Sequence, residues 1–283
     1  DVAGHKEVAT SKRFYIGDID AQNASRSGEL SIGDQDVSQT FSAEITEPII
    51  LLGVPSYKDS GSGVAKVTHV TSTTVTISFK EWEYLDGKHD TESVPYVALT
   101  AGRYLLNNGD ELEVGELSMS STQQWQETTF ESSFVGLPTV ILTSQNNETN
   151  KVFNLLTDNI TSSGFSAKLA EQENNTVGEY TGKVGYLAYY KNELEPIEQS
   201  DPFVVSSNIE VSSDWSAVDS FAISLQEEAS FDEELAHTNE HVAIVNINGT
   251  LLLQQFGELE SDTSSLRRSI VDTDLDNIFD VVD

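Results

Sequence analysis

Apolar and polar residues alternate in short runs along most of the chain. The run from Val67 to Phe79 is rich in β-branched residues, and comparable runs begin at Val94, Pro138 and Val184. Such alternation predicts half-buried β-strands, and clusters of Gly, Asn, Asp and Ser between the runs predict turns. No long stretch follows the period of an amphipathic helix. The pattern therefore predicts an all-β fold made of antiparallel, jelly-roll-like β-sandwich units.

The same apolar pattern occurs twice, at a spacing of ninety residues. The tetrapeptide Gly28–Ser31 also recurs as Gly115–Ser118, at a spacing of 87. A register shared by so many positions indicates that one folding unit was duplicated. We predict an N-terminal strand or linker at 1–26, β-sandwich repeat 1 at 27–114 and repeat 2 at 115–194. The matching residues include Pro48 and Pro138, Val70 and Ile160, Val75 and Phe165, Phe79 and Leu169, Val94 and Val184, and Tyr96 and Tyr186.

A third, partial repeat is expected at 195–257. Trp215 lies ninety residues after Trp125, and the segment from Phe221 resembles the one from Phe165. The chain between the matching Trp and Phe is 34 residues shorter in this repeat, a length that could supply two or three strands. A sheet that lacks central strands exposes unpaired backbone edges. We therefore expect a truncated third unit that packs on repeat 2 or is completed by another chain.

The charge and composition of the chain restrict its partners. There are 15 Lys and Arg residues against 47 Asp and Glu, which gives a net charge of −32. Such a surface repels nucleic acid and anionic membranes, so neither is expected as a partner. The chain has no cysteine and no apolar run long enough to insert into a membrane. We expect an exported protein, extracellular or on the cell surface, processed from a longer polypeptide.

Each repeat carries an acidic segment between two strands. In repeat 1 the segment runs from Phe79 to Tyr96, and its His89 and Glu92 correspond to His237 and Glu240 of the third repeat. Aromatic rings can pack on the apolar face of a sugar, while carboxylates and imidazole bind its hydroxyl groups. The alternative is a partly buried Trp82 beside solvated acids. The candidate carbohydrate-binding residues are Trp82, Tyr84, Asp86, His89, Glu92, His237 and Glu240.

These residues carry a resemblance to a known family. The order of aromatic residues in repeat 2, followed by an acidic strand and Val184-Gly-Tyr-Leu-Ala, is similar to that of H-type lectin-like domains. The resemblance implies six-stranded sandwiches that bind sugars and recur in tandem in secreted bacterial proteins. Repeat 1 lacks the early Trp of the pattern, and repeat 2 lacks the His. The residues of repeat 2 that match are Trp125, Phe130, Phe134, Pro138 and Phe165.

The C-terminal segment 258–283 is expected to be an acidic linker followed by a calcium-type loop. Oxygen ligands at alternate positions of a tight loop can converge on one hard cation. The segment resembles a thrombospondin type-3 calcium repeat, with Asn277 in place of the usual Gly, and this implies a bound Ca²⁺. The alternative is a disordered acidic tail. The candidate metal ligands are Asp272, Asp274, Asp276, Asp280 and Asp283.

No reaction centre is predicted. Glu81 and Glu83 would share one face of a strand, about 6.5 to 7 Å apart, but repetition favours binding or structure over catalysis. The chain has no phosphate-binding Gly-rich loop and no His-Glu-x-x-His motif. We therefore expect a non-catalytic extracellular protein that binds glycans in adhesion. The alternatives are a self-associating subunit of an extracellular filament or surface assembly, and an accessory module of a polysaccharide-degrading enzyme.

Overall fold

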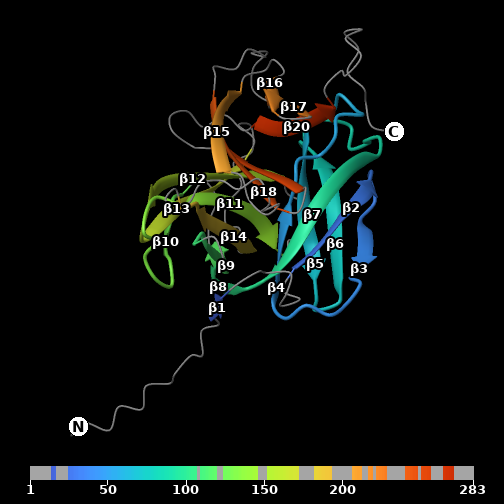
Figure 1. The fold of residues 1–283 in the computed structure, drawn as a ribbon. Coiled ribbons are helices and arrows are strands. Elements are labelled where there is room, and N and C mark those ends of the chain that lie inside the picture. The colour runs from blue at the N-terminus through green and yellow to red at the C-terminus, as the bar shows by residue number, and fades with distance from the viewer. Residues whose placement is uncertain are drawn as a thin grey trace, which may run out of the picture.

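The computed structural model describes residues 14–16, 25–106, 109–119, 124–145, 152–171, 182–192, 206–211, 216–218, 221–227, 240–247, 250–255 and 264–270. Every regular element in these ranges is a β-strand, so the predicted all-β fold is confirmed (Figure 1). None of these ranges contains a helix with the length and hydropathy that crossing a bilayer requires. The strands form three β-sandwich units.

Unit one contains two three-stranded antiparallel sheets. The first has the order β2-β7-β4, with β2 Ser25–Ile32, β7 Glu92–Thr100 and β4 Pro48–Leu52. The second has the order β3-β6-β5, with β3 Val37–Thr40, β6 Thr74–Glu81 and β5 Gly63–Val70. Side chains alternate between the two faces of a strand, so alternate residues meet between the sheets. This core consists of Leu30, Ile32, Phe41, Ile45, Ile50, Val67, Val75, Ile77, Phe79, Val94, Tyr96 and Ala98.

Unit two repeats this arrangement. Its sheets have the orders β9-β14-β11 (Glu111–Met119, Gly182–Tyr190, Thr139–Gln145) and β10-β13-β12 (Gln126–Thr129, Gly164–Glu171, Phe153–Thr161). The first sheet is extended by β8 Gly102–Leu105, which pairs antiparallel with β9, and by β1 Phe14–Ile16, which pairs parallel with β8. Units one and two therefore share one strand order, as their common register predicts.

The recurring tetrapeptide has a steric explanation. Gly28 lies opposite Tyr96 in the sheet of unit one, and Gly115 lies opposite Tyr186 in unit two. A Cβ atom at Gly28 would lie 2.8 Å from the Tyr96 ring, and one at Gly115 would lie 2.5 Å from the Tyr186 ring. In both units the aromatic ring lies across the backbone of the neighbouring strand, which only glycine permits.

Unit three has the same two sheets but a different order along the chain. The sheets are β15-β18-β19 (Ser206–Val211, Glu240–Ile247, Thr250–Gln255) and β16-β17-β20 (Ser216–Val218, Phe221–Glu227, Ser264–Ile270). In unit one, β4 and β5 precede the strands with which they pair. In unit three, β19 and β20 occupy the matching positions but follow them.

This order corrects the expectation that the third unit lacks strands. The connection between β16 and β17 is short, as the sequence indicates, but the two missing strands follow β18. Both sheets of unit three thus have three strands from this chain, and the unit extends past residue 257 to Ile270. Because β19 and β20 occupy these two positions, no strand from another chain is needed to complete either sheet.

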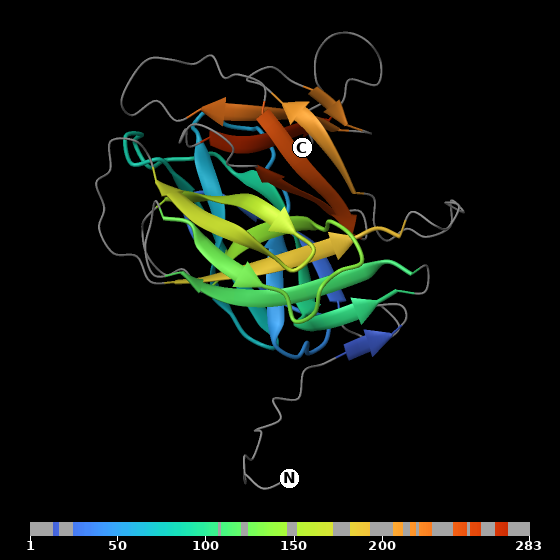
Figure 2. The same ribbon diagram turned by 90° about the vertical axis from the view of Figure 1, so that its left-hand side faces the viewer.

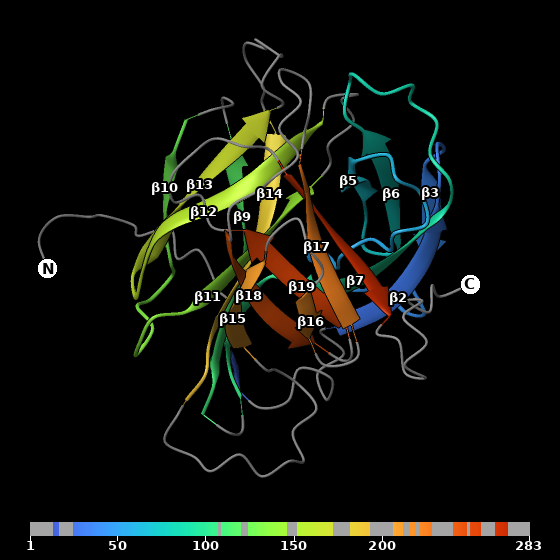
Figure 3. The same cartoon turned by 90° about the horizontal axis from the view of Figure 1, so that it is seen from above.

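The three units meet at a shared apolar core. Each unit turns the sheet that contains β7, β14 or β18 toward this core, and unit three lies against both other units (Figures 2 and 3). Matching residue pairs face one another across the strands at the same register in each unit. A single sandwich would leave this second face in water, so the units bury it only by packing together. The pairs are Leu51 and Val97, Ile141 and Leu187, and Leu252 and Val245, all fully buried.

Two glutamine side chains join the units at their edges. The Gln145 amide accepts a hydrogen bond from the Ile50 N–H (3.1 Å) and donates one to the Ile50 carbonyl (2.6 Å). The Gln254 amide accepts one from the Leu142 N–H (2.9 Å) and donates one to the Leu155 carbonyl (2.6 Å). Buried peptide groups need such partners. The amides therefore satisfy backbone groups where one unit's sheet ends against the next.

Lys66 on β5 is a buried cation in unit one, with only 4% of its surface exposed. Burial lowers the pKa of Lys66 from 10.5 to about 8; nearby Lys80 adds to the effect and Asp36 opposes it. The folded protein therefore releases this proton at a lower pH than the unfolded chain does. The charged form opposes folding below pH 8, and the penalty disappears as the pH rises through 10.5.

We expect Lys66→Met to stabilise the protein at neutral pH, by up to roughly 3 kcal/mol, because the substitution removes this penalty. The difference between variant and wild type should shrink between about pH 8 and 10.5. Urea unfolding of both proteins at several pH values measures this difference in the free energy of unfolding. The effects of other titrating groups are common to both proteins and cancel when the two values are subtracted. A stability difference that stays constant across this pH range would show that Lys66 is not the cause.

Candidate functional site

Two loops lie side by side at one end of unit one. The first, residues 53–62, connects β4 to β5, and the second, residues 82–91, connects β6 to β7. The Trp82 N–H donates a hydrogen bond to the Ser62 carbonyl (3.2 Å), and the Ser56 N–H donates one to the Ser93 carbonyl (2.9 Å). Glu81 at the end of β6 and Glu92 at the start of β7 bring two carboxylates to the base of the loops.

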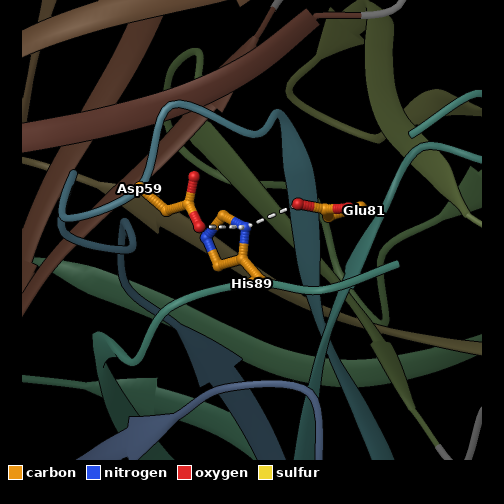
Figure 4. Close-up of side chains that lie close together, drawn as sticks. All are labelled: Asp59, Glu81 and His89. Atoms are coloured by element: carbon orange, nitrogen blue, oxygen red, sulfur yellow. Dashed lines mark hydrogen bonds and ion pairs between the residues drawn. The ribbon is translucent and has the colours of Figure 1, made fainter. Parts of the chain in front are cut away.

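His89 occupies the centre of this region. Its Nδ1 lies 3.0 Å from Glu81 Oε1 and 3.9 Å from Asp59 Oδ2. Figure 4 shows the Asp59 and Glu81 carboxylates pointing toward the ring from either side. Its Nε2 lies 3.1 Å from Glu92 Oε1. The imidazole stacks on the Phe79 ring with the centroids 4.3 Å apart, and the residue is 7% exposed. The ring is therefore fixed on both edges and on one face.

The three carboxylates also bind the backbone of the loops. Glu92, which is fully buried, accepts hydrogen bonds from the Ser56 hydroxyl (2.6 Å) and from the Lys58 and Asp59 N–H groups (3.1 Å each). Asp59 accepts hydrogen bonds from the N–H groups of residues 61 and 90, and Glu81 accepts one from the N–H of residue 87. The cluster thus holds each loop to the other.

The charges of the cluster limit its chemistry. Both ring nitrogens of His89 face carboxylate oxygens, and if both carboxylates are ionised, both contacts are hydrogen bonds when each nitrogen carries a proton. The ring is then an imidazolium between two anions. The same nitrogen and oxygen atoms are ligands that a divalent cation accepts. Among the described residues, Asp59, Glu81 and His89 are the only such group of three whose ligand atoms all lie within 4.8 Å.

The structure places only some of the predicted carbohydrate-binding residues at the surface. Trp82 is 1% exposed, so its ring faces are not available to a sugar, and His89 and Glu92 are buried as well. Tyr84 is 39% exposed and Asp86 is exposed, so these two reach solvent. The proposed pairing of Glu81 with Glu83 also changes, because β6 ends at Glu81 and only Glu83 is exposed.

Some predicted ligands are beyond the described residues. His237 and the acidic positions Asp272 to Asp283 lie there, and only the backbone of Glu240 is described, as the first residue of β18. The calcium site remains a prediction. Asp59 was missed by the sequence analysis because Asp59 to Gly63 reads as a turn. The available signal was an acid in one loop beside a His-x-x-Glu segment in the next.

A second buried polar cluster lies at the opposite end of a sandwich, in unit two. Glu113 accepts hydrogen bonds from the Tyr186 hydroxyl (2.8 Å), from the Arg103 guanidinium (3.2 Å) and from the Glu131 N–H (3.0 Å). Burial raises the pKa of Glu113, and burial and the Glu113 charge raise the pKa of Tyr186. The Arg103 guanidinium lies 3.5 Å from the centre of the Phe134 ring. The cluster is internally paired and 1% exposed at Glu113, which is typical of a structural role.

Comparisons with protein-family models, with curated proteins and with solved structures each found no match. The resemblance to H-type lectin-like domains therefore rests on the residues of this chain alone and stays a prediction.

Proposed function

We propose that the protein is a non-catalytic, extracellular glycan-binding protein, and that the β6–β7 loop of unit one presents its binding surface. One observation carries the proposal. Trp82 and His89 are buried near the two ends of the loop, whereas Tyr84 and Asp86 between them face solvent. A loop fixed in this way has little conformational freedom to lose when a ligand binds.

The exposed residues suit a sugar. An aromatic ring can cover the apolar face of a pyranose, and a neighbouring carboxylate can accept hydrogen bonds from its hydroxyl groups. The net charge of −32 favours neutral or amino sugars over sulfated or acidic ones, because like charges repel. The proposed ligand is therefore a neutral or basic cell-surface or matrix glycan.

The alternative of a filament completed by strand exchange loses its main support. That hypothesis depended on missing strands in the third unit, and β19 and β20 fill those positions. The proposed role of an accessory module beside a catalytic domain remains compatible with glycan binding, since both require the same surface.

Tyr84→Ala should weaken binding to neutral glycans at least tenfold, equivalent to about 1.4 kcal/mol, because the ring is the exposed aromatic surface of the loop. A glycan array followed by titration calorimetry on any glycan that binds would measure this. Trp125→Ala is the matched control, since Trp125 in unit two is equally exposed, at 39%. Undiminished binding by Tyr84→Ala, or no binding of the wild type to any neutral glycan, would contradict the proposal.

A further inference from the structure

We propose that Asp59, Glu81 and His89 form a binding site for a divalent transition-metal ion, with Zn²⁺ as the best-fitting member of the class. The site would hold the two loops of unit one together. It is separate from the proposed glycan contacts, because Tyr84 and Asp86 are not among the ligands.

The distances between the ligand atoms suit such an ion. His89 Nδ1 lies 3.0 Å from Glu81 Oε1 and 3.9 Å from Asp59 Oδ2. In a tetrahedral site with bonds of about 2.0 to 2.2 Å, neighbouring ligand atoms lie roughly 3.3 to 3.6 Å apart. The observed separations lie on both sides of this range. Movements of a few tenths of an ångström would therefore bring both His89 distances into this range, and the Asp59 and Glu81 ligand atoms lie within 4.8 Å of each other.

Glu92 supplies the outer support that metal-binding histidines have. A carboxylate that accepts the N–H on one side of the imidazole fixes the ring and directs the other nitrogen at the ion. Glu92 Oε1 lies 3.1 Å from His89 Nε2, and Glu92 is itself fully buried and hydrogen bonded by Ser56 and Lys58. When the ion binds, the proton on Nδ1 passes to solvent.

The ligand set and its surroundings determine which ion fits. One imidazole nitrogen and two carboxylates suit Zn²⁺ and related ions, whereas Ca²⁺ requires six to eight oxygen ligands. A Cβ atom at Gly61 would collide with Glu81 Oε1 and lie 3.2 Å from His89 Nδ1, so only glycine lets this loop approach the ligand atoms so closely. The Asp59 side chain is 24% exposed, while those of Glu81 and His89 are 4% and 2% exposed. An ion can therefore enter past Asp59.

The sequence of unit three repeats the pattern, which is an observation independent of the distances. Glu81 ends β6 and Glu92 begins β7; correspondingly, Glu227 ends β17 and Glu240 begins β18. His237 precedes Glu240 by three residues, as His89 precedes Glu92. His237 lies outside the described residues, so the proposed site is that of unit one alone.

Zn²⁺ titration of the full chain, stripped with a chelator and dialysed, tests the site. The wild type should bind one more equivalent of Zn²⁺ than Asp59→Asn, or bind it at least about tenfold more tightly. Glu83→Gln is the matched control because it also removes one negative charge, from an exposed residue of the neighbouring β6–β7 loop. Zn²⁺ should raise the melting temperature of the wild type and of Glu83→Gln more than that of Asp59→Asn.

Equal Zn²⁺ binding by all three proteins would overturn the site, since it would show that the acidic surface alone accounts for the ion. A second readout needs no variant. Co²⁺ bound with few ligands, including His89, should give intense visible absorption, and the His89 imidazole NMR signals should shift. If Co²⁺ binds but neither the visible absorption nor the His89 NMR signals change, the ion is bound elsewhere. The cluster is then a set of ion pairs between a protonated His89 and the neighbouring carboxylates.

Discussion

Glu92→Ala should lower the free energy of unfolding by about 3 to 5 kcal/mol, because it removes the buried acceptor that holds His89 against two loops. His89, the Ser56 hydroxyl and the Lys58 and Asp59 N–H groups all lose their bond to this carboxylate. The positive imidazole would then face only the carboxylates on its Nδ1 side. Urea unfolding monitored by tryptophan fluorescence measures the loss, since Trp82 is buried in the same region.

Asp86→Ala is the control for this experiment. It removes a solvent-exposed acid from the adjacent β6–β7 loop, and its effect should stay within about 0.5 kcal/mol. Similar small effects of both substitutions would mean that the buried cluster adds little to stability. A large effect of Glu92→Ala alone would show that the loops depend on it.

Leu51→Ala should cost about 2 to 5 kcal/mol and weaken the packing of all three units together. Leu51 is fully buried in the shared core, a cluster that also contains residues of units two and three. If the units depend on that core, they unfold in one cooperative transition. Hydrogen exchange of β6 in unit one and β13 in unit two, followed by mass spectrometry, should show faster exchange in both.

Leu137→Ala is the matched control, because Leu137 is the same residue type at 68% exposure. Its stability should equal that of the wild type within about 0.5 kcal/mol. If Leu51→Ala accelerates exchange in unit one alone, the units fold independently and the shared core is a contact between finished domains.

The strands and their duplication could be predicted from the sequence because both depend on local patterns. Alternating side chains indicate strands, and the spacing between Tyr96 and Tyr186 fixes equivalent positions in two units. The structure adds the reason for the accompanying glycines, which the rings of these tyrosines cover. These patterns can be recognised in the sequence because each depends only on one strand and the strand paired with it.

The strand order of unit three could not be predicted in this way. A comparison at constant spacing assumes that matching strands occur in the same order, and β19 and β20 follow their partners instead. The shared core did leave a signal. Pro48–Leu52 and Val94–Leu99 are almost continuously apolar, which is typical of strands buried on both faces. A single sandwich needs only one apolar face.

The candidate site was predicted in part. The His-x-x-Glu segment was recognised, but the sequence does not show which face of a loop turns inward, so it left open whether Trp82 contacts a sugar or is partly buried. Asp59 joins His89 through contact between two loops that are separated by two strands in the chain. Such a contact depends on tertiary packing, which no local pattern specifies.

Three sandwich units within one polypeptide have a consequence for how the protein can change. In an assembly of three identical chains, every substitution appears three times around the centre. Here covalent linkage fixes the stoichiometry and lets each unit diverge alone: unit one has Glu92 where unit two has Gly182, and β1 extends only the sheet of unit two. Substitutions can therefore change the surface of one unit while the other two units keep the packing of the shared core.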